Sequence, residues 1–432
     1  MSPSAGAQPA PGPALSAAPV TPPGGDSRPR VPGTFVLVHF LALLGAWMGV
    51  LVPSLVSVAL KVERMDATGK VTTLSLALGA GALVALVANP LFGLLSDRTT
   101  SRFGARRPWM VIGTVGGFAG IAVIAFADST WQIVVGWCLA QCFYNALVAA
   151  IYGVLADQVP ERQMGFASAV LALANPLATL GGTFLVDALN ASTVALLLVP
   201  GVVGAALVVP FLLYGRDRRV TPREVPPMRA RQLLGFLWTN PVRFPSFGWA
   251  WLSRFLMWTS YATVTTYMAY YLSDYLGEDS DGVTHYVFLG SLVANVFILI
   301  ATVPAGRISD RVGRRKPVVL TAAVLLAASM GVMAVATSVT GFLVAQALVG
   351  VGMGVYFAVD IALPADVLPD PNNAAKDLGV MNIAATLPYS LITLIAPTLL
   401  ALGGGNNYPA LFVFGALAAL LAIPAVLPVK RR

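Results

Sequence analysis

The feature that most constrains this chain is a series of long, continuous apolar runs separated by short polar breaks. One helical crossing of a bilayer core of about 30 Å needs roughly 20 apolar residues, and the runs between Thr34 and Val429 reach that length. Hydrophobic residues make up 57% of the 432 residues, and charged residues only 11%. Soluble domains carry about 25% charged residues. The sequence therefore predicts a membrane protein and excludes a soluble enzyme.

The runs are much longer than the strands of an outer-membrane barrel and show no alternation of apolar and polar residues, so we expect helices. Six are expected at residues 34–60, 71–95, 109–127, 131–155, 165–188 and 193–214, and six more at 245–273, 284–306, 317–336, 341–363, 378–402 and 409–429. The predicted fold class is an all-α membrane protein of 12 transmembrane helices in two six-helix bundles, residues 34–214 and 245–429.

The segments outside the two bundles are polar. Residues 1–33 hold nine prolines and five glycines, which predicts a disordered tail without the apolar core of a signal peptide. Residues 215–244 carry seven arginines and two acids and are expected to link the bundles, and residues 430–432 form a basic end. The expected domain plan is therefore a tail, a bundle, a basic linker, a second bundle and a short basic end.

The net charge of +8 reflects where the basic residues lie along the chain. Of the 27 Lys and Arg residues, 23 fall in the two terminal segments and the loops on one predicted side of the membrane. Basic residues accumulate in cytoplasmic loops, so both termini are expected to be cytoplasmic. The excess positive charge is thus a topology signal, with contact to anionic lipid as a secondary consequence. We expect no nucleic-acid partner.

An internal repeat relates the two predicted bundles. The loop after the second helix reads GLLSDRTTSRFGARRPW (Gly93–Trp109), and the loop after the eighth reads GRISDRVGRRKP (Gly306–Pro317). Three landmarks of the first half recur 209 residues later: Gly104 as Gly313, Pro108 as Pro317, and Ala156-Asp157 as Ala365-Asp366. A fixed offset over these separate loops indicates a duplicated six-helix unit.

These two loops resemble the signature loop of the major facilitator superfamily, G-x-x-x-D-R-x-G-R-R. The first copy, SDRTTSRFGARRP, is similar to the corresponding loop of the plant sucrose transporters and the related glycoside-pentoside-hexuronide cation symporters, with Ala105 in place of one arginine. The resemblance implies two bundles related by a pseudo-twofold axis, with helices 1, 4, 7 and 10 around a central cavity. It also implies transport by alternating access.

The resemblance further implies a gate at the signature loops. Gly93 is expected to let neighbouring helices approach closely, and Asp97 to face the positive N-terminus of a helix in the other bundle. We expect these contacts to latch the cytoplasmic side shut, although the arginines could instead serve only topology and lipid headgroups. The expected gating residues are Gly93, Asp97, Arg98, Arg106, Arg107 and Asp157 in the first half, and Gly306, Asp310, Arg311, Arg315 and Asp366 in the second.

Two charges stand apart because they lie well inside predicted helices. Arg254 and Asp360 have similar predicted depths, in helices 7 and 10, so a direct pair between them is possible. An ionisable group at membrane depth costs several kcal/mol unless it is paired or hydrated, so such residues are candidates for function. We expect Asp360 and Arg254 to carry proton coupling.

Aromatic, amide and hydroxyl side chains recur on single faces of the four helices expected to line the cavity. Rings pack on the C–H faces of sugars and amides pair with hydroxyl groups, so these faces suit a neutral polyhydroxylated ligand. Packing between helices would account for the same residues. The expected substrate-binding residues are Trp47, Gln141, Tyr144, Asn145, Tyr152, Trp258, Tyr261, Gln346 and Tyr356.

Helix 4 departs from the sucrose transporters at two positions. Counting back from Asp157, Gln141 replaces their acid and Tyr152 replaces their arginine, while Asn145 is kept. A glutamine cannot take up a proton, so coupling is expected to move to Asp360. One deep carboxylate is too few oxygen ligands for a strong sodium site, and we expect no cofactor and no metal.

The sequence thus predicts a multi-pass protein of the plasma or bacterial inner membrane that transports a small molecule as a functional monomer. The leading hypothesis is proton-coupled symport of a sugar or glycoside. The alternative is export of a drug or secondary metabolite by proton antiport, for which the element from Asn175-Pro176 to Gly181-Gly182 is an imperfect signature. Motifs of P-loop, zinc-protease or serine-hydrolase type are missing, so an enzyme is not expected.

Overall fold

The computed structural model describes residues 29–189, 192–215, 217–218, 243–312, 315–360, 367 and 374–430. Several expectations lie outside these residues: those for most of the N-terminal tail and the linker, for Gly313 and for Asp366. The side chain of Asp310 also lies outside them. Every described secondary-structure element is helical.

The first half of the chain folds into elements α1 to α8. Their bounds are α1 Gly33–Val52, η1 Pro53–Ser57, α2 Val58–Met65, α3 Lys70–Asp97, α4 Arg107–Ala125, α5 Thr130–Gln158, α6 Glu161–Ala172, α7 Ala174–Leu189 and α8 Thr193–Tyr214. The first expected helix, 34–60, runs on to Met65 through the π-helical turn η1, which starts at Pro53. The fifth, 165–188, starts earlier and is divided at Leu173 into α6 and α7.

The second half folds into α10 to α16. Their bounds are α10 Pro245–Tyr270, η3 Tyr271–Tyr275, α11 Ser280–Val312, α12 Lys316–Val335, α13 Val339–Asp360, α15 Ala374–Ala401 and α16 Tyr408–Val426. The eighth helix was expected to end at residue 306, but α11 continues to Val312 and takes up the first half of the second signature loop. The helices α4 and α12 begin 209 residues apart, as do α5 and α13, in agreement with the repeat.

Eleven helical segments of the described chain are long and apolar enough to cross a membrane. The remaining expected helix is α10, the seventh in chain order; it has 26 residues but is not among these eleven. Its serines, threonines, tyrosines and tryptophans, together with Arg254, make it more polar than the others. The structure explains this composition, because α10 packs against α15 and α16 and is buried over most of its second half. A helix covered by protein does not need a lipid-compatible face.

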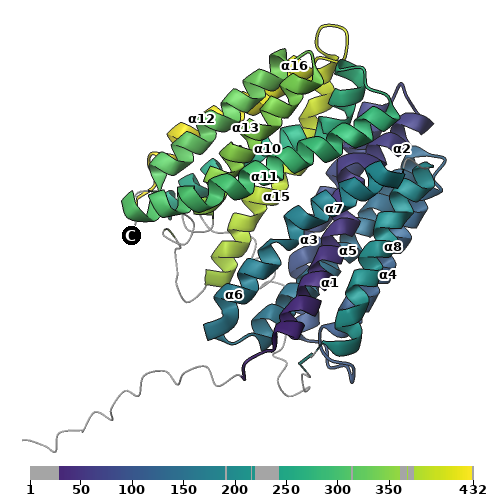
Figure 1. The fold of residues 1–432 in the computed structure, drawn as a ribbon, viewed down its shortest axis with the longest axis vertical. Helices are drawn as coiled ribbons and strands as arrows, with labels where there is room; N and C mark the ends of the chain where they lie inside the picture. The colour runs from purple at the N-terminus through teal and green to yellow at the C-terminus, as the bar shows by residue number, and fades with distance from the viewer. Residues whose placement is uncertain are drawn as a thin grey trace, which may run out of the picture.

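The helices form two groups that lie side by side (Figure 1). Between the groups, α3 packs against α15, and α7 packs against α11. These are helices 2 and 11 and helices 5 and 8 in the order of the twelve. In the repeat, helix 2 corresponds to helix 8 and helix 5 to helix 11. The two contacts are therefore equivalent, as a pseudo-twofold axis requires. The two-bundle layout expected from the repeat therefore fits the structure.

Glycines allow the closest helix contacts within the first bundle. A methyl group at Gly45 of α1 would overlap the backbone carbonyl of Gly204 in α8, and one at Gly204 would lie 2.6 Å from Gly45 O. Without a hydrophobic driving force between helices in lipid, association depends on such close packing. The contact between α1 and α8 therefore depends on both glycines.

We predict that Gly45→Ala destabilises the protein by about 1–3 kcal/mol, because the added methyl group forces α1 and α8 apart. Gly181→Ala is the matched control, since a methyl group there meets nothing within 4 Å. Thermal unfolding in detergent should show a lower melting temperature for Gly45→Ala and no decrease for Gly181→Ala. Equal melting temperatures would contradict this account of the α1–α8 contact.

Candidate functional site

The deepest charges of the second half form a pair. Arg254 on α10 places Nη2 3.0 Å from Asp360 Oδ2 at the end of α13 and donates from Nη1 to the backbone carbonyl of Asp360, 2.7 Å away. The Arg254 side chain is 13% exposed and the Asp360 side chain 9%. The direct pair considered possible from the sequence is therefore present.

Three buried polar atoms at this pair have no hydrogen-bond partner within the described protein: Arg254 Nε, Asp360 Oδ1 and Trp258 Nε1. Trp258 and Tyr356 lie within interaction range of the Asp360 carboxylate. Unpaired polar atoms are costly in an apolar interior, about 1–3 kcal/mol each. The pair thus keeps free donor and acceptor capacity at a buried position, where a polar ligand or a proton can use it.

The predicted polar faces of α10 and α13 face each other. Arg254 contacts Asp360 at one level, and the rings of Trp258 and Phe357 lie 5.9 Å apart at the next. Further along, Gln346 Nε2 donates to Met268 Sδ at 2.9 Å. These contacts join the two helices within one bundle. Gln346 and Tyr356 are each only 3% exposed, so this conformation places both inside the second bundle.

Polar groups expected to bind substrate in the first half lie on α5 and its neighbours. Asn145 Nδ2 donates to Gln141 Oε1 at 3.1 Å, and Asn89 Nδ2 on α3 donates to Asn145 Oδ1 at 3.4 Å. All three side chains are half-buried. The structure therefore adds Asn89 to the expected pair and forms an amide cluster between α3 and α5.

The aromatic residues of the first half differ in exposure. Tyr152 on α5 is 45% exposed and interacts with half-buried Trp47 of α1. In contrast, Tyr144 is 3% exposed and fills the space beside Gly49 and Gly117. Tyr261 packs edge-on against Trp258, with ring centroids 5.8 Å apart. Tyr152 is thus exposed and Trp47 half-buried, whereas Tyr144 serves packing in this conformation.

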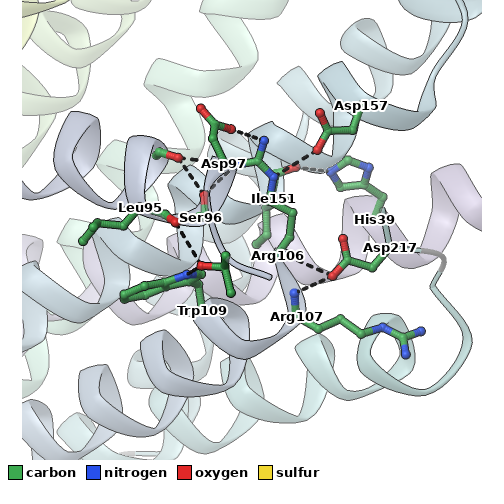
Figure 2. Close-up of polar contacts among 12 residues, drawn as sticks. His39, Leu95, Ser96, Asp97, Arg106, Arg107, Trp109, Ile151, Asp157 and Asp217 are labelled. Carbon is green, nitrogen blue, oxygen red and sulfur yellow. Dashed lines mark hydrogen bonds and ion pairs between the residues drawn. The ribbon is translucent and has the colours of Figure 1, made fainter. Parts of the chain in front are cut away.

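The first signature loop is organised around the guanidinium group of Arg106 (Figure 2). Arg106 Nε lies 3.0 Å from Asp157 Oδ2 on α5, and Nη2 pairs with Asp97 at the end of α3. Nη1 donates to Ser96 Oγ at 2.5 Å. The residue is 5% exposed, so one buried arginine ties the ends of α3, α4 and α5 together.

The neighbouring residue Arg107 has other partners. Its guanidinium donates to the carbonyl of Gly215, and its backbone N–H donates to Asp217 Oδ2 at 2.8 Å. Burial raises the pKa of the Asp217 carboxyl, although hydrogen bonds from the backbone N–H groups of Arg107, Arg106 and Arg218 and the charge of Arg107 oppose the shift. Of the expected arginines, Arg106 therefore binds Asp157, and Arg107 binds the start of the linker.

Two contacts expected at the signature loops are not made in this conformation. A methyl group at Gly93 would meet nothing within 4 Å, so Gly93 does not mark a close helix approach. Its carbonyl instead accepts a hydrogen bond from Ser96 Oγ at 2.8 Å. Asp97 pairs with Arg106 of its own bundle rather than with a helix end of the other. At Gly306 a methyl group would only touch Ala358 at 4.0 Å.

The remaining gating candidates are only partly described. Arg98 is half-buried at the end of α3, and Arg311 is exposed in the last turn of α11. Arg315 immediately precedes α12, as Arg106 precedes α4. The pseudo-symmetric partners Asp310 and Asp366 cannot be placed, because their side chains lie outside the described residues.

The opposite end of the molecule, here called the Lys70 end, is closed by contacts between the halves. Lys70 Nζ lies 2.5 Å from Glu63 Oε1 of its own half and pairs with Asp274 of the second half. Asp274 Oδ2 also accepts a hydrogen bond from Tyr408 Oη at 3.0 Å. Side-chain exposures of 13% for Lys70 and 9% for Asp274 show that this pair is shielded from solvent.

Further contacts at the Lys70 end reinforce the closure. Tyr270 Oη donates to the carbonyl of Ala59 at 3.1 Å, and Ser75 Oγ lies 2.7 Å from Tyr267 Oη. A second polar contact between the halves joins Asp187 Oδ2 to His285 Nδ1 at 3.3 Å, but it is more exposed, at 21% and 49%. The structure thus represents a conformation in which the two bundles are joined at the Lys70 end.

A family model places the chain among known proteins. The model described as the Major Facilitator Superfamily matches residues 35–301 and 289–432. The chain belongs to this superfamily. Membership, together with the eleven candidate membrane helices, makes it a multi-pass membrane transporter rather than an enzyme.

Solved structures share the fold at low sequence identity. A nucleoside transporter, NupG, matches with a TM-score of 0.69 and 11% identity, covering 91% of this chain and 100% of that one. A peptide transporter in complex with alafosfalin gives 0.72 and 13%, covering 91% and 93%. The human organic anion transporter MFSD10 gives 0.65 and 16%, covering 91% and 99%. No curated protein matches the sequence.

Sequence reasoning missed the contacts of the Lys70 end and the role of Asp217. Lys70 and Asp274 are 204 residues apart and lie at helix ends, where a charged residue is ordinary. A signal was available at Asp274, because it follows the polar helix α10 in a segment of three tyrosines, Tyr270, Tyr271 and Tyr275. Within the described residues, no three His, Cys, Asp or Glu side chains gather as a metal site would require.

We predict that Asp274→Asn opens the Lys70 end of this transporter, because the substitution leaves the charge of Lys70 without its partner across the bundles. Loss of a shielded charged hydrogen bond costs about 1–3 kcal/mol, so the ratio of open to closed molecules should rise about 5- to 150-fold. Electron-spin distance measurements between labels at Trp131 and Val335 report this opening, with Cys138 and Cys142 replaced by serine.

Asp187→Asn is the matched control, because it changes the more exposed contact with His285 between the same two bundles. Exposed pairs contribute about 0–1 kcal/mol, so its opening should be clearly smaller. An equal response of the two variants would show that the shielded pair with Lys70 does not hold this end closed.

Proposed function

We propose that the protein is a proton-coupled symporter of a sugar or glycoside that works by alternating access. The observation that carries the proposal is the buried pair of Arg254 and Asp360, with unpaired polar atoms on both partners. In a membrane interior a charge pair is retained against a substantial desolvation cost. Function is the usual reason for such retention.

The proposed proton site is Asp360. Arg254 stabilises its ionised form, and burial at the end of α13 favours its neutral form. When the bundle opens and water reaches the pair, a proton and Arg254 compete for the same carboxylate. Protonation would release Arg254 from Oδ2, and the freed guanidinium could then bind a substrate oxygen. This competition would link proton uptake to ligand binding.

The proposed substrate surface combines rings and amides of the first half. Trp47 and Tyr152 offer accessible aromatic faces, and Asn145 with Gln141 offers amide groups that pair with hydroxyls. Nucleosides, peptides and organic anions are named for the compared transporters, whose low identity supports the fold alone. The choice of a sugar therefore rests on the residues of this chain.

The direction of the described conformation follows from charge. Basic residues cluster in the loops of the end that carries the signature loops, so we assign that end to the cytoplasm. The molecule would then be closed toward the outside by Lys70 and Asp274. Arg106, Asp97 and Asp157 are proposed to regulate the cytoplasmic end. We expect a functional monomer in the bilayer with no cofactor or metal.

We predict that Asp360→Asn abolishes proton-driven accumulation but retains exchange of labelled for unlabelled substrate. An asparagine cannot release a proton, whereas exchange at equal concentrations does not require release. Substrates are first selected by thermal shift over a panel of sugars, and flux is then measured in proteoliposomes with an imposed pH gradient. The accumulation ratio should fall from well above one to about one.

Asp281→Asn is the control for this experiment, because Asp281 is exposed in the first turn of α11. It should leave accumulation unchanged. Uphill uptake that persists in Asp360→Asn would remove Asp360 from the coupling mechanism. Proton-driven expulsion of hydrophobic dyes, without sugar uptake, would favour the exporter instead.

A further inference from the structure

The start of the linker is bound to the first signature loop. Asp217 Oδ2 accepts hydrogen bonds from the backbone N–H groups of Arg106, at 2.9 Å, and Arg107, at 2.8 Å. The backbone N–H of Ala105 donates to the carbonyl of Arg218 at 2.9 Å. With the bond from the Arg107 side chain to Gly215, four contacts join two segments about 110 residues apart.

Gly104 completes this contact in two ways. Its φ of +110° is a backbone conformation that residues with a Cβ rarely adopt. A methyl group at this position would also overlap the carboxylate of Asp217. The glycine of the signature loop thus makes room for an acid from the linker. This gives a structural role to Gly104, which was not among the expected gating residues.

Arg106 takes part both in the contact with the linker and in the ion pairs of the signature loop. Its backbone N–H binds Asp217, and its side chain, 5% exposed, binds Asp97 and Asp157. A methyl group at Gly153 would lie 2.5 Å from Arg106 Cζ, so the guanidinium fits against α5 with little free space. In Figure 2, Asp217 lies beside the backbone of Arg106 and Arg107, and the two other acids lie at the guanidinium.

We propose that Asp217 is a positioning residue for Arg106. By binding the backbone at the start of α4, its carboxylate holds Arg106 where the guanidinium can bridge Asp97 and Asp157 at the same time. The linker that connects the two bundles would thereby act on the ion pairs of the first signature loop. This inference rests on the proposed alternating-access function and adds a residue to its gate.

The first measurement tests the contact itself. Hydrogen exchange at the amides of Arg106 and Arg107 should accelerate at least tenfold in Asp217→Ala, because both N–H groups lose their acceptor. Asp217→Asn keeps an acceptor oxygen and should remain within threefold of the wild type. Ser129→Ala removes the hydrogen bond from Ser129 Oγ to Gln132 Oε1 at the start of α5 and serves as the control, which should not change exchange at Arg106. Unchanged exchange in Asp217→Ala would overturn the proposal.

The second measurement separates positioning from simple helix capping. Spin labels at Phe166 and Val312 report the ratio of open to closed molecules at the signature-loop end. We expect Asp217→Ala and Arg106→Gln each to change this ratio at least fivefold. The double variant should differ from Arg106→Gln by less than twofold, because Asp217 acts through Arg106. If the change in the double variant equals the product of the two single changes, Asp217 acts independently of Arg106, and the proposal is overturned.

Both measurements are made on the full chain in lipid nanodiscs without substrate or pH gradient. A wrong substrate or coupling ion would therefore leave their outcome unchanged, so failure of the proposed function and failure of this inference can be told apart. If Asp217→Ala does not fold, Asp217→Glu replaces it. The longer acid keeps the charge but misplaces the acceptor, and the same loss of coupling to Arg106 is expected.

Discussion

The structure depends on the high cost of leaving a charge unpaired away from water. In the second bundle Arg254 and Asp360 form an ion pair with each other. At the signature loop Arg106 pairs with two acids and donates a hydrogen bond to a serine. At the Lys70 end a single lysine is shared between acids of the two halves. Each of these pairs ties helices whose apolar surfaces alone would not fix their positions, because lipid solvates such surfaces equally well.

The three charge clusters occupy different places in the fold. One joins helices inside the second bundle, one joins helix ends inside the first, and one joins the two bundles. Only the last must separate when the halves move as rigid bodies. The other two can keep each bundle rigid during the movement, and the small-residue contact of Gly45 with Gly204 has the same effect. Charge pairs within each bundle keep it rigid, and the pair between the bundles can break, so this arrangement permits a rocking motion of one bundle against the other.

The helices, the duplication and the deep charge pair were predictable from the sequence, because hydropathy and a fixed residue offset are properties of the chain itself. The sequence did not predict what each helix face packs against. The polar faces of α10 and α13 were expected to line a cavity; in this conformation Gln346 is buried against Met268, whereas Trp258 and Tyr261 remain half-buried. Helical periodicity identifies which residues share a face but not what lies opposite. Asp217 and Asp274 were missed because their partners are distant in sequence and because an acid in a linker or at a helix end is ordinary.

Within the described residues, two π-helical turns, η1 at Pro53–Ser57 and η3 at Tyr271–Tyr275, interrupt the first and seventh crossings near the Lys70 end. A wide turn holds about one residue more than an α-turn, so side chains beyond it are rotated by about 100° relative to a uniform helix. Ala59 follows η1 and Asp274 lies within η3, so both residues that reach the opposite bundle are placed at these turns. Converting either turn to regular α-helix would shift those groups and would also disturb contacts inside the bundles, because Ser57 in η1 donates to the carbonyl of Leu196 and Tyr271 in η3 donates to the carbonyl of Met333.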